Sequence, residues 1–357
     1  VFRDQEFTSD QRSRAVKRIA DVRNLRAQQF VEDSGPLAHP VRPSEYREIN
    51  NFYTPTVYEK GAELIRMLKS LMGADHFKSG MDLYLSRCDG VAATIEDFIS
   101  CFEDVSGQSL SDFTRWYQQA GTPHVTIDES FDDTTGQWII KFSQVTTPTP
   151  GQPKKDPVVI PIALGFLDSS GQEINLIPRK GAISHGVFVL KENEAQIAFD
   201  GLTTKPILSP FRAFSAPVIV HHDTDEAENL IRLAHDSDSF NRWQAAQNIA
   251  TTILKTGVEN LRSGRSFMPH PSFADALRSV LRGHDHAFIA QILAIPSESD
   301  IAREIGNDID PDAIRDVRLA LRKSIGEALS SDLETLIASF STRESYSPDA
   351  KSAGRRA

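Results

Sequence analysis

This 357-residue sequence has few cysteines, no long apolar run and no excess of basic residues, and each of these absences excludes a class of protein. Cys88 and Cys101 are its only cysteines, so no disulfide framework is expected and both thiols are predicted to be reduced. No apolar run approaches the length of about 18 residues that a membrane-spanning helix needs. Basic residues are fewer than acidic ones, and the formal net charge is -10. A nucleic-acid partner is therefore not expected, since it would need a basic face.

The ten histidines include no His-Glu-x-x-His pair, the helical pattern in which two histidines hold zinc beside a glutamate base. No metal site is therefore expected within this chain. The sequence starts at Val1 without an initiator methionine or a signal peptide, and it stops at Ala357 without a helix-ending glycine. We expect a fragment of a longer protein, long enough for two or three domains with sizeable cores.

Helical periodicity dominates the first third of the sequence. Ser9 or Asp10 is the expected N-cap of the first helix, and prolines at 36, 40 and 43 then enforce an extended loop. Thr94 is expected to cap a later helix. Apolar spacing predicts helices over 9–33, 56–72 (ended by Gly73), 75–87, 95–106 and 109–119.

After Pro123 the apolar period changes from helical to alternating. Short alternating runs separated by turn-forming residues predict a small β-sandwich over 122–220, with strands at 124–128, 137–145, 157–167, 186–190 and 196–199. From residue 225 onward the helical period returns, in short antiparallel pairs typical of a solenoid. These helices are expected at 226–234, 240–256, 272–282, 286–293 and 312–340.

The patterns together predict an α+β fold with several domains: a helical domain over 1–121, the sandwich over 122–220 and a solenoid-like helical domain over 221–357. Trp116 and Tyr117 stand at the end of the first domain and are predicted to pack it against the sandwich. Three methionines are assigned to the core, at positions 67, 72 and 81.

Residues 50–61 (NNFYTPTVYEKG) are the strongest candidate for a functional site. They place Tyr53 and Tyr58 at the mouth of a helix, where a phenol could reach a substrate. The alternative for Tyr58 is a helix-terminal side chain half-packed against the core. For Asn50 and Tyr53 the alternative is a structural role in a turn, which an Asn-Asn pair favours.

Two strings that contain histidine pairs are interpreted as structural. His284-Asp285-His286 could suggest a metal site, but Asp285 is a good N-cap and the string is expected at a helix start. His221-His222-Asp223 is expected to be a linker between the sandwich and the later helices.

Several strings, in order along the whole chain, resemble the aminopeptidase N family of gluzincin zinc exopeptidases, most closely its bacterial form. They are VFRDQEF (1–7), FVEDSGPLAHPVRP (30–43), the segment 50–61, RWYQQAGTP (115–123), FSAPV (214–218) and FNRWQAAQ (240–247). The resemblance implies that the chain covers well under half of such an enzyme. It would comprise the helical tail of a thermolysin-like catalytic domain, an Ig-like sandwich and the start of a C-terminal helical domain.

The resemblance also implies an activity, the release of single amino acids from peptides with a free amino end. One zinc ion would activate a water molecule for this reaction. Its histidine and glutamate ligands would lie upstream of Val1, so the chain alone is predicted to be inactive. The intact enzyme would be a monomer of the bacterial cytoplasm that takes part in peptide breakdown. The alternative function is a non-catalytic interaction module built from the sandwich and the later helices.

Four residues of this chain match positions with known roles in the family. Tyr58 matches the tyrosine whose hydroxyl donates to the oxyanion of the tetrahedral intermediate, a task that suits a phenol because it stays neutral near pH 7. Asn50 and Tyr53 match residues that line the pocket for the first side chain. Asp4 matches an acid that hydrogen-bonds a zinc-ligating histidine, with an ordinary surface aspartate as the alternative.

A final expectation concerns stability. Without the zinc helices, apolar faces of 10–30 and 56–72 would be exposed, so poor solubility is expected. The sandwich over 122–220 is predicted to be the part that best resists unfolding.

Overall fold

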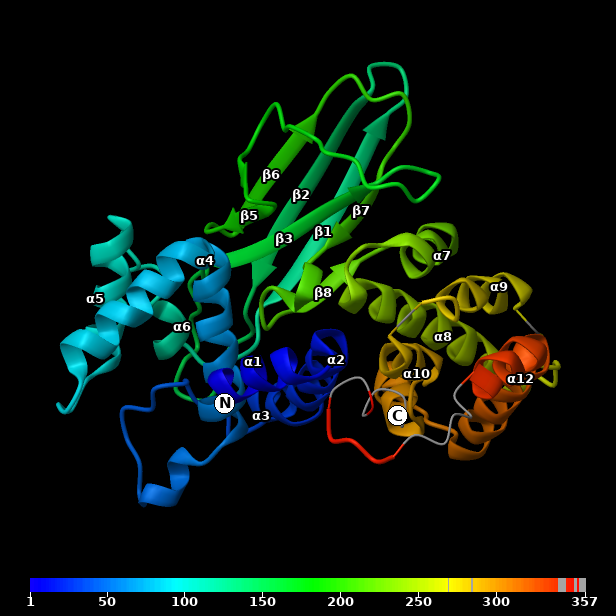
Figure 1. The fold of residues 1–357 in the computed structure, drawn as a ribbon, viewed down its shortest axis with the longest axis horizontal. Helices are drawn as coiled ribbons and strands as arrows, with labels where there is room; N and C mark the ends of the chain where they lie inside the picture. Colours follow the sequence, from blue (N-terminus) through cyan, green and yellow to red (C-terminus); the bar gives the residue numbers. More distant parts are fainter. Residues whose placement is uncertain (269, 284, 340–344, 350–351, 353–357) are drawn as a thin grey trace. The chain divides into compact units, whose positions relative to one another are not determined.

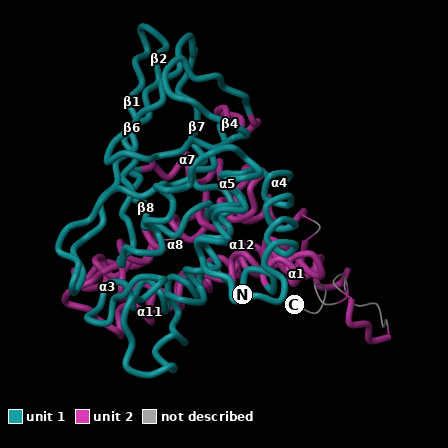
Figure 2. Tube along the Cα trace, turned by 90° about the vertical axis from the view of Figure 1, so that its left-hand side faces the viewer, with its two compact units in different colours: residues 1–4, 21–166, 174–223 teal, residues 5–20, 167–173, 224–357 magenta. Residues whose placement is uncertain are grey.

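The computed structural model describes residues 1–357 except 269, 284, 340–344, 350–351 and 353–357 (Figure 1). The chain divides into two compact units (Figure 2). The first contains Val1–Asp4, Asp21–Phe166 and Ile174–Asp223, and the second contains Gln5–Ala20, Leu167–Glu173 and Thr224–Ala357.

Helices make up the first part of the chain, as predicted. They are α1 (Phe2–Gln11), α2 (Arg14–Asn24), the π-helical turn η1 (Leu25–Gln29), α3 (Phe30–Ser34), the 3-10 turn η2 (Ile49–Phe52), the π-helical turn η3 (Thr56–Lys60), α4 (Gly61–Cys88), α5 (Ile95–Ser106) and α6 (Arg115–Gln118).

The expected N-cap of the first helix was wrong. Ser9 lies inside α1, where its hydroxyl donates to the carbonyl oxygen of Gln5 at 2.7 Å. Asp10 lies in the same helix and pairs with Arg14. A new helix starts after Ser13, whose hydroxyl oxygen accepts from the Val16 amide at 3.3 Å and so caps α2.

Other boundaries follow the predicted signals more closely. Gly73 interrupts α4 with φ 74° and ψ 167°, so the helices predicted on either side of it are separated by a kink. Thr94 caps α5 in a capping box with Asp97. The helix predicted over 109–119 is wrong for its first half, because Ser109 accepts a hydrogen bond from the Ser111 amide and competes with the helical bonding pattern.

The strands form two four-stranded sheets, in the orders β6-β2-β1-β8 and β4-β5-β3-β7 (Figure 1). Their bounds are β1 (His124–Asp132), β2 (Gln137–Val145), β3 (Ile160–Leu167), β4 (Ile183–Ser184), β5 (Val187–Leu190), β6 (Glu194–Phe199), β7 (Ile207–Pro210) and β8 (Ile219–His222). A 3-10 turn, η4 (Arg212–Phe214), precedes β8. Residues 137–144 of β2 alternate between half-buried and buried, as expected for a sandwich strand.

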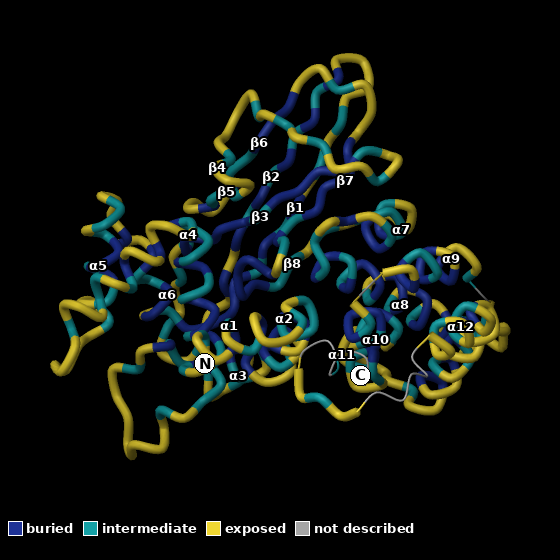
Figure 3. The backbone as a smooth tube through the Cα atoms, viewed as in Figure 1, coloured by how far each residue is buried: buried dark blue, intermediate teal, exposed yellow. Residues whose placement is uncertain are grey.

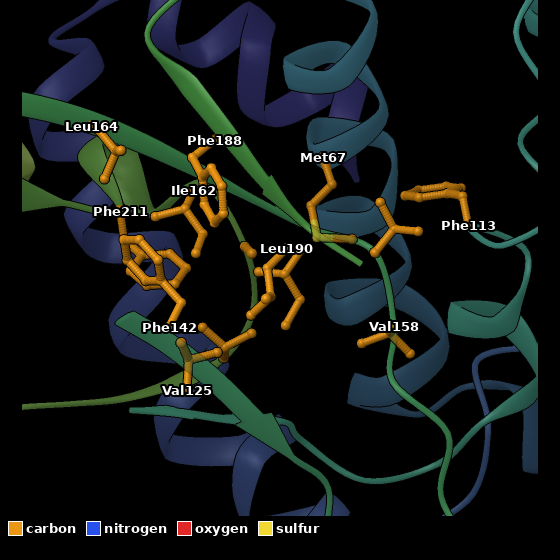
Figure 4. Close-up of a cluster of buried hydrophobic side chains, with 14 of the residues drawn as sticks. Met67, Phe113, Val125, Phe142, Val158, Ile162, Leu164, Phe188, Leu190 and Phe211 are labelled. Atoms are coloured by element: carbon orange, nitrogen blue, oxygen red, sulfur yellow. The ribbon is translucent and has the colours of Figure 1, made fainter. Parts of the chain in front are cut away.

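One hydrophobic core runs through the helical part and the sandwich of the first unit (Figures 3 and 4). Met67 of α4 belongs to the same cluster as Phe142 of β2 and Leu190 of β5. Trp116 and Tyr117 are buried in it, and the Trp116 indole donates to the Val159 carbonyl oxygen at 2.7 Å. The predicted packing role of this pair is therefore confirmed. Of the three methionines, those at 67 and 72 are buried and the one at 81 is half-buried against the cluster.

Helices also make up the last part of the chain. They are α7 (Glu226–His235), α8 (Ser239–Arg262), α9 (Pro271–Val280), α10 (His286–Leu293), α11 (Glu298–Ile305) and α12 (Pro311–Ser339). Pairs close in sequence pack together, including α7 with α8 and α11 with α12. The expected end of the last helix, Phe340, lies outside the described residues. In the part of the chain that the structure describes, no helix has both the length and the apolar content to cross a membrane.

Candidate active site

Two tyrosine rings stack at the start of the long helix that η3 and α4 form. The ring centroids of Tyr53 and Tyr58 lie 5.8 Å apart, with 19° between the ring planes. Both side chains are open to solvent, with exposed fractions of 67% and 43%. Neither hydroxyl has a hydrogen-bond partner among the described residues, so each is available to a molecule from outside.

The 3-10 turn η2 holds Asn50 beside this tyrosine pair. The Asn50 carbonyl oxygen accepts from the Tyr53 amide at 3.1 Å. Glu48 and Asn51 form a capping box at the start of η2, and the Asn51 side chain accepts from the Glu48 amide at 3.3 Å. The Asn50 side chain is exposed and takes no part in that box.

Thr54 links the tyrosine pair to the preceding proline-rich loop. Its hydroxyl oxygen accepts from the Val57 amide at 3.2 Å, and its carbonyl oxygen accepts from the Tyr58 amide at 3.1 Å. His39 Nε2 lies 3.0 Å from the same hydroxyl, and His39 Nδ1 lies 2.9 Å from the Leu37 carbonyl oxygen. Because a carbonyl can only accept, Nδ1 carries a proton in this contact. In the neutral ring Nε2 then accepts from the Thr54 hydroxyl.

The opposite face of η3 is buried and carries an ion pair. Lys60 Nζ lies 2.8 Å from Asp33 Oδ2 and donates to the Gly121 carbonyl oxygen at 2.9 Å. Asp33 also accepts from the Gly121 amide at 3.2 Å and from the Thr122 hydroxyl at 3.0 Å. The exposed fractions of the Lys60 and Asp33 side chains are 1% and 0%. The Lys60 ammonium lies 5.8 Å from the centroid of the Trp116 ring.

This buried cluster shifts the pKa of two groups. Burial alone would raise the pKa of the Asp33 carboxyl. The Lys60 charge and hydrogen bonds from Gln29 and Thr122 outweigh burial and hold that pKa below its ordinary value. Burial and the nearby Lys60 charge lower the pKa of Lys155. Asp33 is therefore an anion that compensates buried positive charge rather than an acid available for proton transfer.

A second carboxylate contacts the first residue of η3. Glu32 Oε2 accepts from the Thr56 amide at 2.9 Å and from the Thr56 hydroxyl at 2.5 Å. Gln29 Nε2 donates to the Thr56 hydroxyl oxygen at 3.3 Å. Glu32 and Asp33, consecutive acids of α3, thus bind the first and the last residue of η3. Tyr58 lies between these two residues.

Asp4 lies apart from this group. It is exposed in the first turn of α1, and no hydrogen bond, ion pair or ring contact joins it to Asn50, Tyr53 or Tyr58 in the described chain. The structure thus brings together three of the four residues singled out from the sequence.

No group of three or more histidine, cysteine, aspartate or glutamate side chains that could hold a metal ion occurs within the described residues. These residues therefore do not fit a zinc site by themselves. Asp285 caps α10 by accepting from the Phe288 amide at 3.0 Å, as predicted, while His284 lies outside the described residues.

Residues 221–223 were predicted to form a linker, and this prediction was wrong for the two histidines. His221 and His222 belong to β8, which pairs in parallel with β1. His222 Nε2 lies 2.7 Å from Glu129 Oε1 of β1, and His221 Nε2 lies 2.8 Å from His124 Nδ1. The linker prediction failed because four residues without strong alternation give little strand signal, and their partner strand is remote in sequence.

Chemically, the arrangement presents the exposed Tyr58 hydroxyl as a hydrogen-bond donor beside the stacked ring of Tyr53. A phenol in this position can donate to negative charge that develops on a bound carbonyl group.

Comparisons with known proteins cover the whole chain. Residues 2–117 match the peptidase family M1 domain. Residues 121–223 match a domain of unknown function (DUF3458) with an Ig-like fold, and residues 226–357 match a domain of unknown function (DUF3458_C) with ARM repeats. The chain is 42% identical over 335 residues to aminopeptidase N of Escherichia coli and 43% identical over 359 residues to aminopeptidase N of Caulobacter vibrioides. This chain is a homologue of bacterial aminopeptidase N, in peptidase family M1.

The homologue spans about two fifths of the length of these relatives. The alignments cover 93% of this chain but 38% of the Escherichia coli protein, and 100% of this chain but 40% of the Caulobacter protein. A crystal structure of Legionella pneumophila aminopeptidase A in complex with aspartic acid has the same fold, with a TM-score of 0.79 at 23% identity. That match covers 99% of this chain and 39% of the other.

The predicted fold class is confirmed by these matches. A helical segment of the M1 domain, an Ig-like β domain and an ARM-repeat helical domain follow one another along the chain.

Sequence reasoning missed the residues that support the tyrosine pair, above all Lys60. A signal for it was present. Lys60 falls on the apolar stripe of the helix, in register with Leu64, Met67 and Leu71, and a lysine in such a stripe needs a buried partner. Glu32 and Asp33 offered no comparable signal, because two acids near a helix end are common on surfaces.

Proposed function

We propose that this chain is the part of a zinc aminopeptidase that supplies the tyrosine for transition-state stabilisation. The observation that carries the proposal is the Tyr58 hydroxyl, at the start of a helix inside the residues that match the M1 domain, where the side chain is exposed and the hydroxyl has no hydrogen-bond partner among the described residues. Identity above 40% to two bacterial aminopeptidases N supports the same reaction class. The substrates would be peptides with a free amino end.

In this proposal each candidate residue has a distinct task. Tyr58 donates its hydroxyl proton in a hydrogen bond to the oxyanion as the scissile carbonyl becomes tetrahedral. Tyr53 holds the Tyr58 ring by stacking and, with Asn50, borders the pocket for the first side chain. Asp4 would orient a histidine that binds zinc. We place the domains at 1–121, 122–220 and 221–357.

Family membership implies one zinc ion in the intact enzyme, and we propose that polypeptide outside these 357 residues holds it. The free thiols of Cys88 and Cys101 support a reducing compartment such as the cytoplasm.

The proposal is tested with aminoacyl-arylamide substrates. The 357-residue chain is expected to show no hydrolysis with or without added zinc, whereas a longer protein that contains it is expected to hydrolyse these substrates. Zinc-dependent cleavage by the chain alone would contradict the assignment of the ligands to other polypeptide. A longer protein that binds zinc but cleaves nothing would favour the non-catalytic interaction module.

A further inference from the structure

The helical turn that carries Tyr58 is capped by two residues, Thr54 just before it and Glu32 of α3. Pro55 stands at the N-cap of η3 and makes no side-chain capping hydrogen bond. The Thr54 hydroxyl oxygen accepts from the Val57 amide at 3.2 Å, and the Glu32 carboxylate accepts from both the amide and the hydroxyl of Thr56 at 2.9 and 2.5 Å. Its negative charge also faces the positive end of the long helix formed by η3 and α4. The part of the cap that binds Thr56 therefore comes from a residue 24 positions earlier in the chain.

Asp33 holds the other end of the same turn through Lys60. Thr56 and Lys60 are four residues apart and so share one face of the helix, while Tyr58 lies two residues from each and on the opposite face. Burial agrees with this geometry, since the exposed fractions are 0% for Thr56, 1% for Lys60 and 43% for Tyr58. The contacts of Thr56 and Lys60 on the buried face therefore set the direction in which the Tyr58 side chain leaves the exposed face.

The turn is also unusual in its backbone. Both η1 and η3 are π-helical, they contact each other, and Gln29 Nε2 of η1 donates to the Thr56 hydroxyl oxygen of η3 at 3.3 Å. Single π-helical turns inside α-helices are rare and are frequently found at functional sites. Side chains from outside the turn, those of Gln29 and Glu32, hydrogen-bond its first residue.

We infer that Glu32 and Asp33 are positioning residues for Tyr58. They hold the two ends of the buried face of η3 and thereby fix the direction in which the Tyr58 hydroxyl points. Neither acid needs to touch the substrate. This inference rests on the proposed function, because it gives the half-buried Glu32 carboxylate and the buried Asp33 carboxylate a purpose in the same reaction.

The first test is spectroscopic and uses the 357-residue chain labelled with 3-fluorotyrosine. The six tyrosines give six fluorine signals, and Tyr53→Phe and Tyr58→Phe assign the two of interest. Glu32→Ala and Thr56→Val are expected to shift the Tyr58 signal, and Thr56→Ser is expected to restore it because the hydroxyl is kept. The matched control is Glu45→Ala, which removes an exposed carboxylate from the neighbouring loop. The signals of Tyr84 and Tyr117 report whether each variant remains folded.

The second test is kinetic and uses the longer aminopeptidase that contains this chain. Glu32→Ala is expected to lower kcat about tenfold or more with KM changed less than about twofold, because a misplaced donor weakens the transition state and not substrate binding. Asp33→Asn is expected to act in the same direction. Zinc content is measured in parallel and is expected to be unchanged.

The outcomes separate this inference from the proposed function. An unmoved Tyr58 signal in both Glu32→Ala and Thr56→Val overturns the positioning role, whatever Tyr58→Phe does to turnover. A loss of zinc together with kcat also overturns it, because the acid would then act on the metal site. Full turnover in Tyr58→Phe, with a shifted signal in Glu32→Ala, overturns the proposed function and supports the positioning geometry.

Discussion

Lys60 illustrates how a single buried charge shapes its surroundings. Its ammonium binds the Asp33 carboxylate and the Gly121 carbonyl group, so η3, α3 and the segment before β1 meet at one side chain. Exchange of one partner of such a pair leaves the other charge buried and uncompensated.

The Lys60→Met variant is therefore expected to lose about 3–5 kcal/mol of unfolding free energy. Urea unfolding of the 357-residue chain measures this loss. Lys78→Met is the matched control, because Lys78 pairs with Asp82 on the surface with exposed fractions of 77% and 62%. Equal unfolding free energies for the two variants would contradict the importance of the buried pair.

His124 and His221 provide a test of pH dependence. His124 Nδ1 and His221 Nε2 lie 2.8 Å apart, and the two ring planes differ by 6°. The ring centroids lie 5.1 Å apart, so the two rings are nearly coplanar and share an in-plane N–H···N hydrogen bond. Burial and the neighbouring His221 lower the pKa of His124. The unfolded chain therefore binds this proton more tightly than the folded chain does.

It follows that unfolding free energy falls as the pH drops from about 7 through the ordinary histidine pKa of about 6.5. In His124→Gln this part of the pH dependence is expected to vanish, because glutamine bonds without titrating. Urea unfolding at several pH values between neutral and mildly acidic compares the two. Identical slopes for wild type and variant would show that the pair does not couple protonation to folding.

At the scale of elements, Gly73 marks the kink that divides α4. Its φ of 74° with ψ of 167° lies in a region that is essentially restricted to glycine. Beyond its chain neighbours and the backbone of its own helix, no atom of the described residues lies within 4 Å of a Cβ placed there, so backbone strain is what opposes a substitution.

Gly73→Ala is expected to destabilise the protein by about 1–3 kcal/mol. Gly326→Ala in α12 is the matched control, because that glycine also has open space around its Cβ position but lies in an ordinary helix. There alanine is expected to stabilise by about 0.5–1 kcal/mol. Thermal unfolding of both variants measures the difference, and equal effects would argue against strain at the kink.

Elements with local signals could be predicted from the sequence, and elements without them could not. The Gly73 break and the Thr94 cap follow from single residues with known preferences. The π-helical turns η1 and η3 could not be foreseen, because apolar spacing does not separate a π turn from an α turn. Likewise Tyr58 was recognisable as exposed at a helix start, whereas its support by Glu32 and Lys60 depends on tertiary contacts.

For the whole molecule, the shared core changes the expectation about stability. The sequence suggested that the sandwich alone would resist unfolding. In the structure Leu64 and Met67 of the helical part belong to the same hydrophobic cluster as Val125 and Phe142 of the sandwich. Residues in one continuous core are expected to open together.

Amide hydrogen exchange tests this point. Peptides from α4 and from β2 are expected to exchange at the same slow rate in the 357-residue chain, because both depend on opening of the first unit. Peptides from α8 belong to the second unit, so their exchange rate can differ from that of the α4 and β2 peptides. Protection of β2 that persists while α4 exchanges freely would restore the view that the sandwich is stable by itself.

The central claim is that Tyr58 stabilises the transition state of an aminopeptidase, and steady-state kinetics of Tyr58→Phe in the longer protein tests it most directly. The variant loses only a hydroxyl that has no partner in the described chain. We predict that kcat falls by about 10²–10³-fold, as for other lost oxyanion donors, with zinc content and fold unchanged. Turnover near that of the wild type would contradict the claim.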